Sequence, residues 1–197
     1  MKVHKLFPTP VFESHIDVDL ETIDVVTNTD YERAAFNDIS DDRDVLTMLP
    51  ELSQEILEAT KYYMYTQLGI HRHITPYIVR SWSTRHGQDD NAKLHCHSNA
   101  IFSGVYYVNA PHNSGTITFH DANHSTFHPT ITPDGEHNEL TERHHTIYPK
   151  NGMLLIFPAH LLHHVSNNMT HKTRYVIGFD IFIHGTFGEH TGCKITL

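Results

Sequence analysis

Residues 93–109 read KLHCHSNAIFSGVYYVN, and this stretch carries the pattern on which the fold interpretation depends. Its second half, AIFSGVYYV (100–108), is a short apolar run typical of a buried strand. Just before it, His95 and His97 stand two positions apart. Side chains at i and i+2 of a β-strand point to one face, about 7 Å apart. The spacing therefore predicts a pair of imidazoles that can reach one metal ion.

Similar runs occupy the chain from residue 75 onward, separated by Gly, Pro, Asn and Asp. They predict strands at TPYIVRSWS (75–83), GTITFH (115–120), HTIYP (145–149), GMLLIF (152–157) and TRYVIGFDIFI (173–183). So many strands without helices between them favour antiparallel sheets, arranged as a sandwich or a jelly-roll barrel. The pattern argues against a parallel nucleotide-binding sheet.

The first 74 residues differ from the rest because they contain helical spacing. The stretch 6–16, LFPTPVFESHI, alternates around two prolines and predicts an edge strand, and a short helix is expected over 17–27. A longer helix should begin at Pro50 and stop at Gly69. Its repeating positions, three or four residues apart, are Leu52, Ile56, Leu57, Thr60, Met64 and Leu68. We expect the helices to support the sheets from outside.

The length of 197 residues fits one domain that buries its own core. We divide it into an N-terminal strand and helices (1–74) and a β core (75–185). Residues 121–145 are polar and too many for an ordinary connection between strands. They are interpreted as a lid.

Charge and cysteine content narrow the range of partners. The chain has 14 basic and 23 acidic residues, a net charge of −9, without a basic cluster, which opposes binding to nucleic acid. Cys96 and Cys193 cannot build a disulfide framework or a zinc knuckle, which suits a reducing cytoplasm. No apolar run is long enough for a signal peptide or a membrane span. The expectation is a cytoplasmic protein without a membrane or nucleic-acid partner.

A third histidine completes the predicted metal site. His163 lies on a second apolar segment, LLIFPAHLLHHV (154–165), and could close a facial triad with other positions on the ion left open. Open metal sites are typical of catalysis rather than of structural support. His160 and His164 compete with His163 for this role. Arg174 lies in an otherwise apolar strand, where burial would demand a negative partner.

These motifs occur in an order that resembles the 2-oxoglutarate and Fe(II)-dependent oxygenases. The segments are LFPTPVF, SWSTRHGQDDNAKLHCHSNAIFSGVYYVN, SGTITFHD, PKNGMLLIFPAHLLHHV and TRYVIGFDIF, which together span nearly the whole chain. In detail the sequence is similar to a bacterial and phage subgroup with a His-x-His and distal His motif. The combination is specific, because His-x-His alone is common.

The resemblance implies a mainly β fold, the double-stranded β-helix or cupin-like jelly roll, with supporting N-terminal helices. It implies Fe(II) bound by His95, His97 and His163, with His97 in place of the usual Asp or Glu. Arg174 would bind the distal carboxylate of 2-oxoglutarate, and Tyr107 would hydrogen-bond the same group. The implied reaction uses O2 and hydroxylates a substrate, with succinate and CO2 as coproducts.

Several alternatives stay open at this point. His97 could turn aside in favour of a carboxylate such as Asp121, and Tyr106 could replace Tyr107 if the strand register shifts by one residue. The protein could instead be a cupin-like metal enzyme that does not use 2-oxoglutarate, or a non-catalytic β-sandwich that binds a ligand. The sequence leaves the substrate open between a small molecule and a protein side chain, and it is compatible with a homodimer.

Overall fold

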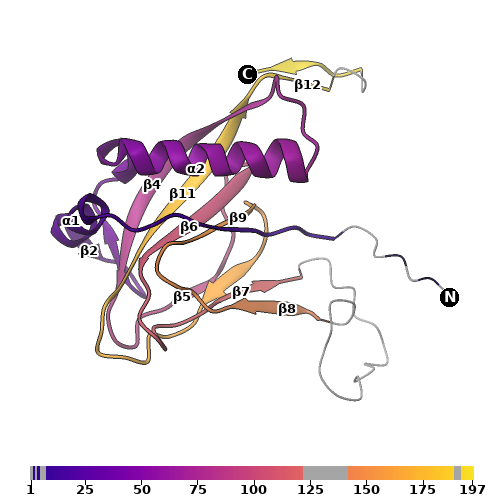
Figure 1. Ribbon diagram of the computed structural model, residues 1–197. Coiled ribbons are helices and arrows are strands. Elements are labelled where there is room, and N and C mark those ends of the chain that lie inside the picture. Colours follow the sequence, from indigo (N-terminus) through magenta and orange to yellow (C-terminus); the bar gives the residue numbers. More distant parts are fainter. Residues whose placement is uncertain (1, 3, 5–7, 122–141, 189–191) are drawn as a thin grey trace.

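The computed structural model describes residues 2, 4, 8–121, 142–188 and 192–197, which form two facing β-sheets with helices on one side (Figure 1). The larger sheet has seven strands in the order β1-β9-β6-β11-β4-β3-β2, with antiparallel neighbours. Its strands are β1 (Phe12–His15), β2 (Tyr31–Arg33), β3 (Asp38–Ser40), β4 (Thr75–His86), β6 (Phe102–Asn109), β9 (Met153–Pro158) and β11 (Arg174–His184).

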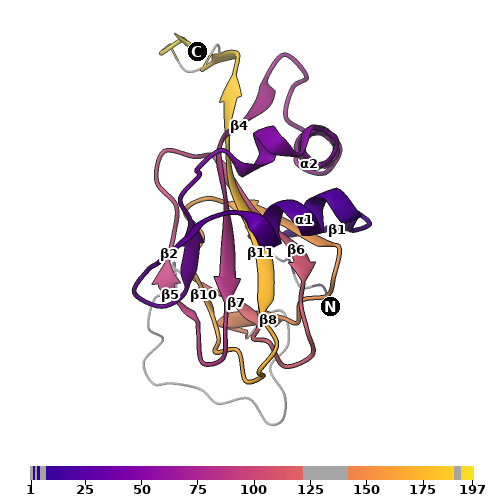
Figure 2. The ribbon, with the colours of Figure 1, turned by 90° about the vertical axis from the view of Figure 1, so that its left-hand side faces the viewer.

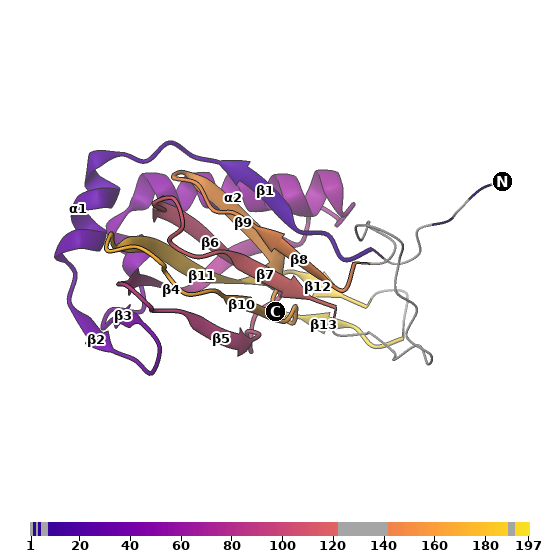
Figure 3. The same cartoon turned by 90° about the horizontal axis from the view of Figure 1, so that it is seen from below.

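The smaller sheet has four strands in the order β5-β10-β7-β8. They are β5 (Ala92–His95), β7 (Ile117–His120), β8 (His144–Ile147) and β10 (His163–Val165). Figure 3 shows this sheet in front of the strands of the larger one. Side chains from both sheets, including Phe119 of β7 and Leu155 and Phe157 of β9, form a buried cluster between them. This arrangement is the predicted jelly roll, and the mainly β fold class is confirmed.

Two helices cover the outer face of the larger sheet (Figure 2). Helix α1 (Leu20–Asn28) begins after Asp19, whose carboxylate accepts a hydrogen bond from the backbone N–H of Thr22 at 2.6 Å. Helix α2 (Pro50–Tyr62) follows a 3-10 turn, η1 (Val45–Met48), and continues as a π-helical turn, η2 (Tyr63–Gln67). The side of the helices that faces the sheet buries Val26, Leu52, Ile56 and Met64 in a second cluster. Both expected helices are therefore present as supports.

The structure adds elements that the sequence did not predict. Strands β2 and β3 are only three residues long and pair with each other beside β4. Strand β12 (Thr186–Phe187) pairs with β13 (Ile195–Thr196) in an antiparallel direction. Runs this short carry no clear alternation. Most of the expected lid, 121–145, lies outside the described residues. Among the residues that are described, no helix is both long and apolar enough to cross a membrane.

Candidate metal centre and cosubstrate pocket

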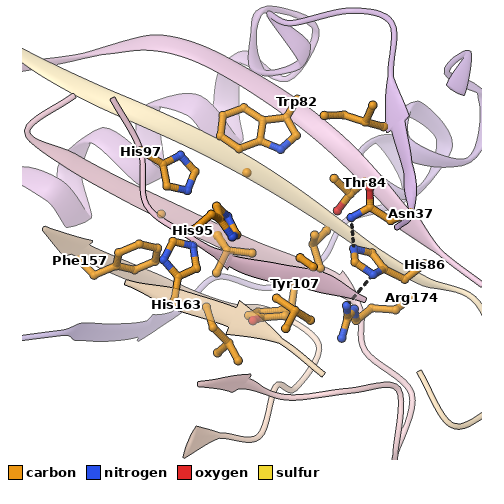
Figure 4. A pocket seen from close by; sticks show the side chains of 18 of the residues that line it. Asn37, Trp82, Thr84, His86, His95, His97, Tyr107, Phe157, His163 and Arg174 are labelled. Carbon is orange, nitrogen blue, oxygen red and sulfur yellow. Dashed lines mark hydrogen bonds between the residues drawn. The ribbon is translucent and has the colours of Figure 1, made fainter. Parts of the chain in front are cut away.

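Three histidines converge at the mouth between the two sheets. His95 ends β5 and His163 begins β10, and the two are direct partners across these strands. Nitrogen atoms of His95, His97 and His163 all lie within 4.8 Å of one another. Figure 4 shows the three rings facing a common point. Among the described residues this is the one cluster of histidine, cysteine or acidic side chains close enough to share a metal ion.

The structure corrects one detail of the expected pair. His97 does not lie on the same strand as His95, because β5 ends at His95 and the chain turns toward the larger sheet. The backbone N–H of His97 donates to the carbonyl of Ala159 at 2.8 Å, which fixes the turn against the segment before His163. His97 thus reaches the cluster from a loop, not through the alternation of a strand.

Hydrogen bonds set the tautomers of two of the rings. The Nδ1 of His95 donates to the carbonyl of Lys93 at 2.6 Å, and that of His163 donates to the carbonyl of Leu161 at 2.9 Å. A carbonyl can only accept, so the proton is on Nδ1 and the lone pair of Nε2 is available to a cation. Burial lowers the pKa of His95, and it lowers the pKa of His163 to about 3. Both rings are therefore in the neutral form that binds metals.

His97 is held by a carboxylate instead. Its Nδ1 lies 3.0 Å from Oδ1 of Asp180, a side chain that is 1% exposed. Asp180 also accepts hydrogen bonds from the hydroxyl of Ser103 at 2.5 Å and from Nε of Arg80 at 2.6 Å. Burial favours a higher pKa for Asp180, but the bonds from His97, Ser103 and Arg80 outweigh it and lower the pKa. The carboxylate is thus ionised behind the ring of His97.

Sequence reasoning missed Asp180, although a signal was present. Alternate residues of a strand face the same side. Asp180 stands six positions after Arg174, a predicted site residue, and therefore on the same face of β11. Arg174 pairs with His86 of β4 and Asp180 pairs with Arg80 of β4, and both of these β4 residues line the cavity.

The other end of the site is built around Arg174, which is 1% exposed. One terminal nitrogen donates to the carbonyl of Ser114 at 2.6 Å, and the other lies 2.9 Å from Nδ1 of His86. Burial, followed by the charge of Arg174, lowers the pKa of His86 to about 3, so this ring is neutral and its Nδ1 accepts. The Nε of Arg174 has no hydrogen-bond partner among the described residues. A buried cation with one unused donor suits an anionic ligand.

Tyr107 and Tyr106 have different positions, which settles the register of β6. Tyr107 lines the same cavity as Arg174, and burial raises its pKa to about 12, so the phenol is a neutral donor. Tyr106 points to the opposite side of the sheet, where its hydroxyl donates to the carbonyl of Ile16 at 3.1 Å. Thr84 on β4 also faces the cavity, and its buried hydroxyl has no partner within the described part of the chain.

The remaining candidates lie elsewhere. His160 and Asp121 line a separate cavity beside β7 and β8, and His164 pairs with His120 through ring nitrogens 2.8 Å apart. The geometry therefore groups His163, not its neighbours, with the His95 and His97 pair. Asp121 does not belong to the group.

One cavity of about 570 Å³ connects the histidines with Arg174. Val105, Phe157 and Val176 form part of its apolar wall. A cavity of this size can hold a small diacid together with a second molecule. Hydrogen-bond donors without partners at one end and three convergent imidazoles at the other are compatible with an elongated carboxylate that also chelates a metal.

A mainly β jelly roll with three convergent histidines at its mouth and a buried arginine deeper in the cavity is an arrangement suited to a non-haem metal enzyme. Comparison with known proteins narrows the class. Residues 80–180, just over half of the chain, match the family described as "Putative 2OG-Fe(II) oxygenase". The chain belongs to this family. It is a 2-oxoglutarate-dependent oxygenase, whose cofactor set is Fe(II), 2-oxoglutarate and O2.

Solved structures support the same fold. SnoN, a non-heme alpha ketoglutarate dependent epimerase from nogalamycin biosynthesis, is 13% identical with a TM-score of 0.64, over 88% of this chain and 78% of SnoN. HygX from Streptomyces hygroscopicus, solved with nickel, 2-oxoglutarate and hygromycin B, is 13% identical with a TM-score of 0.57, over 88% of this chain and 82% of HygX. An oxidoreductase of the 2OG-Fe(II) oxygenase family from Burkholderia pseudomallei is 14% identical with a TM-score of 0.56, over 80% of this chain and 73% of that protein. No curated protein matches the sequence.

Proposed function

We propose that His95, His97 and His163 hold the Fe(II), and that Arg174 and Tyr107 bind the distal carboxylate of 2-oxoglutarate in an enzyme that hydroxylates a small molecule. The observation that carries this assignment is the cavity itself. It has three convergent imidazoles at one end, and at the other a buried guanidinium with an unused Nε donor.

The donor set fits Fe(II), because imidazole is a common ligand of this ion and a facial arrangement leaves positions free. When bound, iron and 2-oxoglutarate supply the oxidising chemistry with O2. The contribution of the protein is to orient the reactants and exclude water. Phe157 and Val105 provide apolar surface beside the histidines, and Arg174 and Tyr107 present donors to one carboxylate.

Asp180 compensates for the absence of an acidic ligand in this proposal. Three imidazole ligands bring no negative charge to the ion, whereas the usual triad contains one carboxylate. Asp180 lies one hydrogen bond behind His97, and such a carboxylate orients a ligating imidazole and raises its basicity. The negative charge is thus kept near the iron, although each of the three proposed ligands is a nitrogen atom.

The finer aspects of the function follow from the same features. A cavity of about 570 Å³ suits a small molecule better than a side chain on a folded protein. The charge of −9 speaks against a nucleic-acid partner. Cys96 and Cys193 are free thiols, which supports action in the cytoplasm.

We further propose that the chain is one domain. All proposed site residues come from a single chain, so a homodimer would not be needed to complete the site.

An anaerobic titration tests the assignment. Adding 2-oxoglutarate to the Fe(II)-loaded protein should produce a visible metal-to-ligand charge-transfer band, because the keto acid chelates the iron. Arg174→Leu should abolish this band at moderate 2-oxoglutarate concentration while Fe(II) binding persists. Arg72→Leu is the matched control, because Arg72 is exposed and lies outside the cavity.

Each outcome bears on the residue assignment. A band that persists after Arg174→Leu would show that Arg174 does not bind the cosubstrate. A folded, Fe(II)-loaded wild type without a band would show that 2-oxoglutarate does not chelate the metal at this site. Formation of succinate from 2-oxoglutarate without added substrate would further support the oxygenase.

A further inference from the structure

The second half of strand β4, residues 80–86, lines the cavity and gives it two distinct ends. Its alternate residues Arg80, Trp82, Thr84 and His86 all face the cavity. With about 3.3 Å per residue, Arg80 and His86 lie about 20 Å apart. His86 contacts Arg174, the proposed anchor of 2-oxoglutarate. The Arg80 end is therefore available to a second ligand.

Two arginines, Arg43 and Arg80, line this second end. Arg43, Arg80 and Arg174 line the cavity, which accounts for three of the seven arginines of the chain. Among the described lining residues there is no Asp or Glu. Although the whole chain has a charge of −9, the ionised side chains that line the cavity are arginines, and the carboxylates paired with Arg80 and Arg43, Asp180 and Glu32, are not among the lining residues. A cavity lined by one sign of charge concentrates ligands of the other sign.

Arg80 has unused donors. Its Nε donates to Asp180, but neither terminal nitrogen has a hydrogen-bond or ion-pair partner among the described residues. The side chain is 49% exposed, and its guanidinium carbon lies 5.3 Å from the centre of the Trp82 ring. The bond to Asp180 and the indole together hold the guanidinium in place while its outer edge stays open to the cavity.

Arg43 lies next to this position. Its carbonyl accepts from the backbone N–H of Ser81 at 2.8 Å, which places it beside the segment that carries Trp82. Its ion pair with Glu32, at 3.3 Å, is on the surface and uses one terminal nitrogen. Surface pairs of this kind are weak and exchange readily with a better ligand.

Trp82 connects the two arginines with the metal centre. Its ring stacks with that of His97, with centroids 5.7 Å apart and planes at 25°. A Cβ on Gly178 would lie 2.6 Å from the indole, so glycine at this position lets the ring lie flat against β11. The indole is a flat apolar surface between Arg80, which lies over its ring, and His97, which stacks with it; Figure 4 shows the indole near His97.

We propose that the primary substrate carries an oxyanion, a carboxylate or a phosphate, which Arg43 and Arg80 bind, while its apolar body lies on Trp82 with the reacting carbon toward the histidines. The inference rests on the proposed function, because it assumes that 2-oxoglutarate takes Arg174. Guanidinium groups form paired hydrogen bonds with either oxyanion.

Trp82 is the single tryptophan of the chain, so intrinsic fluorescence reports on this wall directly. The experiment uses protein loaded with Ni(II) and saturating 2-oxoglutarate, at constant ionic strength. The probes are phenylacetate, phenyl phosphate and the neutral phenylacetamide. We expect at least one anion to change the emission saturably, and phenylacetamide to bind about tenfold more weakly or worse. The stronger of the two anions identifies the kind of oxyanion.

Arg43→Gln should weaken binding of the anions by about tenfold or more. Arg72→Gln, outside the cavity, should leave it unchanged. Affinity for 2-oxoglutarate, measured by calorimetry on the same Ni(II)-loaded samples, should be the same in both variants.

The inference is overturned if phenylacetamide binds as tightly as the anions, if none of the three probes changes the emission, or if the two variants behave alike. In these cases intact binding of metal and 2-oxoglutarate would leave the proposed function standing. Failure of the wild type to bind metal and 2-oxoglutarate would remove both proposals.

Discussion

Replacing Asp180 with asparagine is the sharpest test of how this site works with three imidazoles. Asparagine has the same shape, and its amide oxygen can still accept a hydrogen bond from His97, but the negative charge is lost. Asp180 is 1% exposed, so solvent does not screen its interaction with His97. Loss of a carboxylate behind a ligating histidine costs about 10–100-fold in metal affinity, or about 1.4–2.7 kcal/mol. We also expect about 1–3 kcal/mol less stability, because bonds from Ser103 and Arg80 weaken.

The assay is calorimetric titration of the metal-free protein with Ni(II) at neutral pH, alongside urea unfolding. Asp38→Asn is the matched control: Asp38 is also a largely buried carboxylate held by arginines, but it does not line the cavity. It should lose stability and keep its metal affinity.

Repeating Asp180→Asn in a His97→Asp variant shows whether Asp180 affects metal binding through His97 or only through the stability of the fold. In His97→Asp the ligand itself is a carboxylate, so Asp180→Asn should no longer weaken metal binding. Wild-type affinity in Asp180→Asn, or an equal loss in the His97→Asp background, would refute the reasoning.

Three further outcomes follow from the geometry. His86 and His163 have pKa values of about 3 in the fold and about 6.5 when unfolded, so the unfolded chain takes up more protons between these values. The free energy of unfolding of the metal-free protein should therefore be highest above about pH 6.5. It should fall as the pH drops toward 3, by up to about 1.4 kcal/mol per pH unit for each histidine. Urea unfolding at several pH values checks this, and a flat profile would contradict it. Tyr107→Phe should raise the Kd of 2-oxoglutarate by about tenfold with unchanged Ni(II) affinity, as measured by calorimetry. Gly178→Ala should displace Trp82 and shift its emission maximum, whereas an unchanged spectrum would show that the indole does not need this space.

Much of the fold could be predicted from sequence because its central strands are long and apolar. β6, β9 and β11 each lie within about two residues of the predicted run, since burial on both faces leaves a continuous apolar signal. β4 extends to His86, beyond the predicted end at residue 83, because polar residues on a strand that borders a cavity break the pattern.

The histidine cluster was accessible for a different reason. His95 precedes the apolar run that forms β6 and His163 follows the run that forms β9, so their positions were predictable from spacing and order. Asp180 and His86 were not assigned, because each acts through a partner more than 80 residues away in the chain. Alternation with Arg174 gives the face of β11 on which Asp180 lies, but it does not identify that distant partner. Arg80 was hidden for the same reason, as an ordinary polar residue in a strand.

The division of the site between two sheets has a consequence for handling the protein. His95 and His163 belong to the smaller sheet, whereas Arg174 and Tyr107 belong to the larger one. Metal and 2-oxoglutarate together would span both layers like a cross-link, and ligands that bind only the folded state stabilise it. Chelators should therefore act as mild denaturants of this enzyme, and amide hydrogen exchange should accelerate first in the short strands β5 and β10.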